Sequence, residues 1–78
     1  MQFDNIINTL KKRRENFKVS QENLSKLSGV GLRTIKQFES GKGNPTLQTI
    51  QKIANVLGLE ICLKVKTQLI DEESKNTL

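Results

Sequence analysis

The stretch that decides the fold runs from residue 20 to residue 40 and reads SQENLSKLSGVGLRTIKQFES. Ser20 is a favourable N-cap, and the apolar spacing after it predicts a helix over residues 21–28. The Gly-Val-Gly sequence at residues 29–31 is long enough only for a tight turn, and its first glycine suits a left-handed helix end. A second helix is predicted over residues 32–40. The stretch is therefore two short helices joined by a three-residue turn.

Six residues in this stretch suit the packing of two crossed helices. Ser25 is small, as the crossing point requires, and Gly29 allows a sharp turn. The apolar residues that would lock the pair at a fixed angle are Leu24, Val30, Ile35 and Phe38. This arrangement is a helix-turn-helix, and its second helix projects from the body. Because the DNA major groove is about 12 Å wide and admits a helix, the pattern predicts DNA binding.

The flanking sequence predicts two more helices. One begins after Asp4 and ends near Asn16, and the other covers residues 47–57 with Thr46 as its N-cap. The side chains expected to face inward are Phe3, Ile6, Ile7, Leu10 and Phe17 of the first helix, Leu24 and Leu27 of the second, Ile35 and Phe38 of the third, and Leu47, Ile50, Ile53, Ala54 and Leu57 of the fourth. The fold class is therefore mainly α.

The period of the apolar pattern changes from 3.6 to 2 after Gly58. Residues 59–66 alternate between apolar and polar, which predicts a half-buried strand whose apolar residues are Leu59, Ile61, Leu63 and Val65. No second strand is predicted, so the backbone groups of this one need a partner. The same segment of a second copy is the obvious one, which predicts a homodimer. Residues 1–66 would form the domain, and residues 67–78 a disordered acidic tail.

The amino-acid composition narrows the range of possible functions. The 78 residues carry 13 Lys and Arg against 8 Asp and Glu, and this net charge of +5 favours an anionic partner. With no histidine and a single cysteine, a disulfide within the chain, histidine-based catalysis and a Cys/His zinc site are excluded. We therefore expect neither an enzyme nor a bound cofactor or metal. The longest apolar run is three residues, so no membrane partner and a cytoplasmic location are expected.

Two parts of the sequence resemble known families. Residues 19–25 (VSQENLS), Gly29 and residues 33–42 (RTIKQFESGK) resemble the phage repressor/Cro (XRE) family. This resemblance covers about residues 5–58 and implies a four-helix, lambda-repressor-like domain that represses transcription from a palindromic operator on double-stranded DNA. Residues 44–47 (NPTL) and 57–60 (LGLE), followed by a strand, are similar to HipB-like antitoxins. That similarity implies strand pairing across a dimer, autoregulation and binding to a HipA-like kinase toxin.

The resemblance also implies roles for individual residues. Gln21 matches a position that holds a DNA phosphate and braces the recognition helix, the second helix of the motif. Arg14 and Glu39 match a pair that forms a partly buried salt bridge between the first and third helices. The positions that face DNA hold Gly31, Leu32, Arg33, Lys36 and Gln37. Lys18 departs from the family pattern, because glycine is common at its position.

The chemistry of these side chains suggests how DNA is read. Arg33 and Gln37 lie four residues apart, on one face of the recognition helix. Arginine pairs with guanine and glutamine with adenine, each discriminating by about 1–3 kcal/mol. Lys36 shares the base-facing surface but suits phosphate better, and Leu32 suits a thymine methyl group. Phosphate contacts are assigned to Gln21, to the backbone of Gly31, and to a cradle formed by Lys42, Asn44 and the helix N-terminus at Thr46.

Several interpretations stay open at this stage. The charge run over residues 11–13 is more typical of a solvated helix face than of a DNA contact. Cys62 suits an ordinary reduced thiol better than a redox or intersubunit role. The chain fits an antitoxin, a stand-alone XRE-type regulator without a toxin, or a protein–protein adaptor that mainly neutralises a toxin. An adaptor would be expected to show an apolar or acidic face on the recognition helix.

Overall fold

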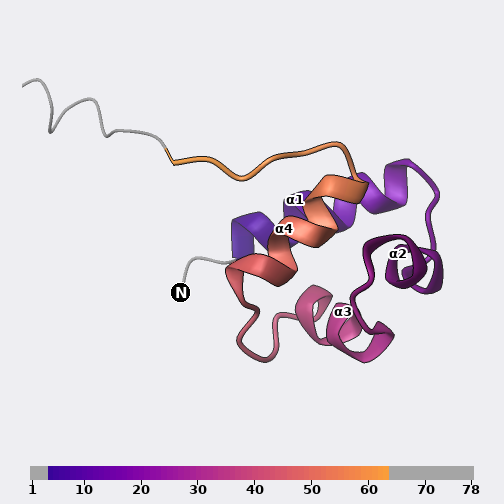
Figure 1. The fold of residues 1–78 in the computed structure, drawn as a ribbon, viewed down its shortest axis with the longest axis horizontal. Coiled ribbons are helices and arrows are strands. Elements are labelled where there is room, and N and C mark those ends of the chain that lie inside the picture. Colours follow the sequence, from indigo (N-terminus) through magenta and orange to yellow (C-terminus); the bar gives the residue numbers. More distant parts are fainter. Residues whose placement is uncertain (1–3, 64–78) are drawn as a thin grey trace, which may run out of the picture.

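The structure, a computed structural model, describes residues 4–63 as four helices followed by an extended segment (Figure 1). The helices are α1 (Asp4–Asn16), α2 (Gln21–Ser28), α3 (Leu32–Glu39) and α4 (Leu47–Val56). The predicted mainly helical class is confirmed, and the predicted helix bounds agree to within one residue. None of these helices is long and apolar enough to cross a membrane.

The helix ends follow the predicted capping chemistry. The Ser20 hydroxyl accepts a hydrogen bond from the backbone N–H of Asn23 at 3.0 Å, and the Thr46 hydroxyl accepts one from Thr49 at 3.1 Å. Gly29 ends α2 with a φ of 77°, in the left-handed region that glycine adopts without steric cost. These three positions set where α2 and α4 begin and where the turn into α3 starts.

The core is apolar and lies where the four helices meet. Its centre is formed by Leu24 of α2 and Ile35 of α3, both of which are fully buried. The other buried hydrophobic side chains are Ile7, Leu10, Val30, Phe38, Ile50, Ile53, Ala54 and Leu57. All four apolar positions predicted to lock the helix pair are therefore buried. Because α3 is anchored through Ile35 and Phe38, its opposite face is presented outward.

Three predictions of inward-facing side chains are wrong. Phe17, Leu27 and Leu47 are 52%, 65% and 60% exposed. Phe17 lies beyond the end of α1, so the helical spacing no longer applies to it. Leu27 lies on the wrong side of α2, whose inward face turns toward Ser25 and Ser28 rather than back toward position 27. Leu47 is the first residue of α4 and projects beyond the edge of the core.

The segment after α4 is extended but is not part of a sheet. Among residues 4–63 the structure contains no β-strand. Leu59 and Ile61 are half-buried against the core, while Glu60, Cys62 and Leu63 are exposed. The strand and its pairing across a dimer therefore stay predictions. The predictions for Phe3, for Val65 and the end of the strand, for the boundary at residue 66 and for the tail lie outside the described residues.

Candidate nucleic-acid interface

The exposed face of α3 gathers most of the predicted DNA-facing side chains. Arg33, Lys36 and Gln37 are exposed and Leu32 is half-buried. One open hollow on this face is lined by Leu32, Arg33, Lys36, Gln37, Ser40 and Lys42. The four predicted base-facing residues therefore share one surface. Its side chains can form hydrogen bonds and it carries three cationic residues.

The loop after α3 is folded back onto the end of that helix. The Gln37 carbonyl accepts hydrogen bonds from the Ser40 hydroxyl at 2.9 Å and from the backbone N–H of Lys42 at 3.0 Å. A second hollow is lined by Thr34, Gln37, Phe38, Lys42, Gly43, Asn44 and Pro45. Lys42 thus borders both the base-facing surface and the predicted phosphate cradle.

Two more of the predicted phosphate contacts, Gly31 and Thr46, are helix N-caps in the structure. Gly31 is the N-cap of α3, and its carbonyl accepts from the backbone N–H of Ile35 at 3.0 Å. The Thr46 hydroxyl caps α4 and also donates to the Thr49 hydroxyl at 3.0 Å. The Thr46 hydroxyl is therefore already used within the chain. A phosphate at this place would be attracted mainly by the positive dipole end at the start of α4.

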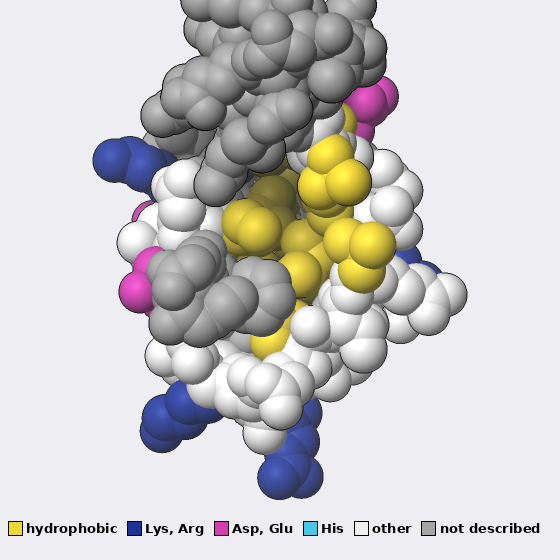
Figure 2. Space-filling view, turned by 90° about the vertical axis from the view of Figure 1, so that its left-hand side faces the viewer, with side chains coloured by type: hydrophobic (Ala, Val, Ile, Leu, Met, Phe, Trp, Pro, Cys, Tyr) yellow, Lys and Arg dark blue, Asp and Glu magenta, His cyan; other side chains and the backbone are white. Residues whose placement is uncertain are grey.

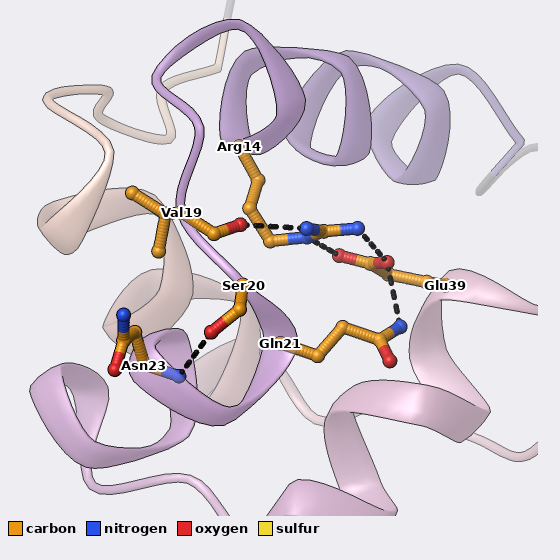
Figure 3. A network of polar contacts seen from close by, with 6 residues as sticks. All are labelled: Arg14, Val19, Ser20, Gln21, Asn23 and Glu39. Atoms are coloured by element: carbon orange, nitrogen blue, oxygen red, sulfur yellow. Dashed lines mark hydrogen bonds and ion pairs between the residues drawn. The ribbon is translucent and has the colours of Figure 1, made fainter.

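A polar network ties α1, α2 and α3 together (Figure 3). Arg14 Nε and Nη2 donate to the two Glu39 carboxylate oxygens at 2.7 and 2.9 Å, so the expected pair is bidentate. Arg14 Nη1 donates to the Val19 carbonyl at 2.7 Å. Gln21 Nε2 donates to Glu39 Oε1 at 2.9 Å. The network holds the end of α3 against both preceding helices.

The burial of the pair makes it a structural element. The Arg14 and Glu39 side chains are only 11% and 5% exposed. The hydrogen bond to Glu39 raises the pKa of Arg14 above its ordinary value, against the opposing effect of burial. Arginine therefore stays charged at neutral pH. Because an amide nitrogen has two N–H groups, Gln21 keeps a second donor that a DNA phosphate could accept from.

Comparison with known proteins agrees with this geometry. A family profile described as helix-turn-helix matches residues 10–63. The chain belongs to the helix-turn-helix family. It is also 42% identical over 52 residues to an uncharacterized HTH-type transcriptional regulator of Archaeoglobus fulgidus, a match that spans 67% of this chain and 73% of that protein. The predicted XRE-type membership is confirmed at the level of the family, and the HipB-like similarity stays a prediction.

Hydrogen bonds in the turn of the helix-turn-helix were not predicted from the sequence. The Ser25 hydroxyl donates to the Val30 carbonyl at 2.6 Å, and the Val30 N–H donates to the Ser28 hydroxyl at 3.1 Å. The crossing of the two helices requires Ser25 only to be small. Serine at short spacing from a turn is a recognised signal for such side chain-to-backbone bonds. They hold the turn that sets the angle of the recognition helix.

The role of Arg13 was not predicted from the sequence either. Its Nε donates to the Leu57 carbonyl at 2.6 Å, and its guanidinium Cζ lies 4.9 Å from the centre of the Phe17 ring. Arg13 therefore caps the end of α4 rather than belonging to a wholly solvated charge run. The two bonded residues are 44 positions apart, so no local pattern could reveal the contact.

Proposed function

We propose that this helix-turn-helix protein is a sequence-specific DNA-binding repressor that acts as a homodimer on a palindromic operator. The observation that carries the proposal is the exposed face of α3, where Arg33 and Gln37 share one surface with Lys36 and Lys42. Family membership and the name of the Archaeoglobus fulgidus relative support the coarser class, a DNA-binding transcriptional regulator.

The proposed mechanism divides the contacts by chemistry. Arg33 pairs with guanine and Gln37 with adenine in the major groove, while Leu32 contacts a thymine methyl group. Lys36 and Lys42 neutralise phosphates, which fixes the register of the protein on the duplex. The polar network of Arg14, Glu39 and Gln21 keeps α3 at the angle that these contacts need. A protein–protein adaptor is less well supported, because its recognition helix would be apolar or acidic.

The homodimer explains how a short recognition helix can select a site. Each copy would read one half-site, with the two half-sites about 34–36 Å apart on one face of the DNA. The alternating segment after α4 is the proposed contact between the copies, through Leu59, Ile61, Leu63 and Val65. Deleting residues 59–78 is expected to lower the sedimentation mass from that of a dimer to that of a monomer.

The narrower role as a HipB-like antitoxin rests on residues 44–47 and 57–60 and on the strand predicted after them. It requires a partner kinase of the HipA type. Co-expression of the chain with a HipA-like kinase encoded beside it, followed by affinity purification, tests this role. Co-purification in a fixed ratio supports an antitoxin, and the absence of a neighbouring kinase supports a stand-alone regulator.

Binding to DNA selected from a random double-stranded library tests the main proposal. Fluorescence anisotropy is measured on the selected DNA and on a scrambled version over a range of salt concentrations. With about four phosphate contacts per copy and ~0.9 counterions released for each, the slope of log affinity against log salt is expected near −7. Failure to enrich any sequence contradicts specific readout, and a slope near −2 contradicts the phosphate contacts.

A further inference from the structure

A groove that the DNA-binding role does not use lies between α1, α4 and the segment after α4. Its volume is about 290 Å³, and it is lined by Asn5, Ile6, Thr9, Leu10, Ile50, Ala54, Leu59, Glu60, Ile61 and Cys62. Figure 2 shows hydrophobic side chains gathered on one face of the molecule. Exposed apolar surface of this kind on a small domain marks an interaction site more often than it marks a defect.

The charge of the groove does not suit DNA, which is the partner proposed for α3. Of the ten residues that line it, none is Lys or Arg and Glu60 alone is charged, although the chain carries a net charge of +5. Anionic DNA therefore has no attraction to this surface. Two like-charged copies, in contrast, repel each other least where cationic side chains are absent. The groove is also separate from the hollow on α3, so both can be occupied together.

The segment that borders the groove is only partly packed against its own chain. Leu59 and Ile61 rest against the core of their own chain, but Leu63, the next apolar residue of the alternation, is 98% exposed. Residues 60–63 make no backbone hydrogen bond to another described residue. Edges of this kind accept an added strand, with pockets for alternate side chains beside it. The groove and the exposed Leu63 thus lie on one continuous surface.

We propose that the groove binds Leu63 of a second copy, so that each subunit inserts this side chain beside α1 and α4 of its partner. The inference rests on the proposed homodimer and adds the surface on which the partner sits. A cavity of roughly 150 Å³ holds one benzene-sized group, so a groove about twice as large has room for more than one aliphatic side chain. Covering it would also enlarge the core of a domain that is small for independent stability.

A matched pair of charge substitutions on α1 tests this placement. Thr9 is exposed and lines the groove, whereas its neighbour Asn8 is exposed outside it. Thr9→Glu places a carboxylate where an apolar side chain should be buried, so the dimer dissociation constant measured by sedimentation is expected to rise at least about tenfold. Asn8→Glu, with the same change in charge on the same helix, is expected to leave it unchanged.

A second substitution sharpens the result. Leu63→Lys alone should weaken the dimer, and in the Thr9→Glu background it should restore part of the affinity, because the lysine of one copy then meets the glutamate of the other. If the full chain is a dimer and Thr9→Glu behaves like Asn8→Glu, the groove inference is overturned while the homodimer stands. If the full chain is a monomer at every concentration, the homodimer itself is contradicted, and only DNA binding remains for the anisotropy assay.

Discussion

The α2–α3 pair and the segment at residues 59–63 differ in how fully they are packed and hydrogen-bonded within one chain. The pair is anchored by Leu24 and Ile35 and fixed by the hydrogen bonds of Glu39 and Ser25. The segment packs two side chains against the core and leaves Leu63 exposed. A recognition helix must be rigid before DNA arrives, whereas a dimer contact is finished by its partner. The difference therefore separates the part proposed to read DNA from the part proposed to join two copies of the chain.

The largest effect is expected from breaking the network in the rigid region. Glu39→Ala leaves the guanidinium of Arg14 nearly buried without its carboxylate, which costs about 3 kcal/mol of unfolding free energy. For a domain of this size, that corresponds to a fall of roughly 12–24 °C in Tm. Thermal unfolding followed by circular dichroism measures it. Glu22→Ala, at an exposed position of α2, is the control and should change Tm little.

A loss of less than about 1 kcal/mol in Glu39→Ala would show that the network orients α3 without stabilising the fold.

A smaller loss is expected at the start of α2. Ser20→Ala removes the acceptor for the Asn23 N–H and should cost about 1 kcal/mol. Ser20→Asp keeps an acceptor at the same place and should match the original chain within about 0.5 kcal/mol. Urea denaturation of the three proteins measures both changes. Equal losses in the two variants would mean that the serine is needed for something other than capping.

A gain is expected at the connection between α1 and α2. Lys18 has a φ of 58°, a left-handed backbone conformation that is strained for a residue with a Cβ atom. Lys18→Gly should raise stability by about 0.5–1 kcal/mol, and Lys18→Ala, which keeps the Cβ atom, should not. Their melting temperatures decide between strain and loss of the charge. No difference between the two variants would contradict the strain.

The smallest effect on the stability of the fold is expected in the segment at residues 59–63. Leu63 is 98% exposed, so Leu63→Ala should change the stability of the isolated subunit by less than about 0.5 kcal/mol. At higher protein concentration the original chain should gain stability through association, and the variant should gain less. Melting temperatures over a hundredfold range of concentration measure this. A large loss at every concentration would mean that Leu63 packs within its own chain.

Short-range signals predicted most of the fold. The caps at Ser20 and Thr46 and the glycine at position 29 are local chemistry, so the helix bounds followed from the sequence. The exposure of Leu27 did not follow, because two leucines three residues apart do not fix which side of α2 turns inward. The exposure of Leu47 did not follow either, because helical spacing does not show how far the core reaches along α4. The bond from Arg13 to Leu57 was equally hidden by its long separation in sequence.

The candidate site also has a part that could be predicted from the sequence and a part that could not. Arg33, Lys36 and Gln37 could be placed on one face because they lie within one short helix. That Lys42 joins the same hollow depends on the loop folding back onto the end of α3, which the glycines around it permit but do not specify. What the segment after α4 pairs with depends on a second molecule, so one chain cannot display it.

Specific readout by α3 is tested most directly by comparing Arg33→Ala with Lys42→Ala on the selected operator and on scrambled DNA by fluorescence anisotropy. Arg33→Ala is expected to weaken operator binding by roughly 1–3 kcal/mol per half-site, to relax the preference at one base pair, and to affect scrambled DNA little. Lys42→Ala should weaken both about equally and flatten the salt slope by about one unit per lost contact. If Arg33→Ala lowers both affinities equally, Arg33 contacts only phosphate, and α3 does not read the sequence through it.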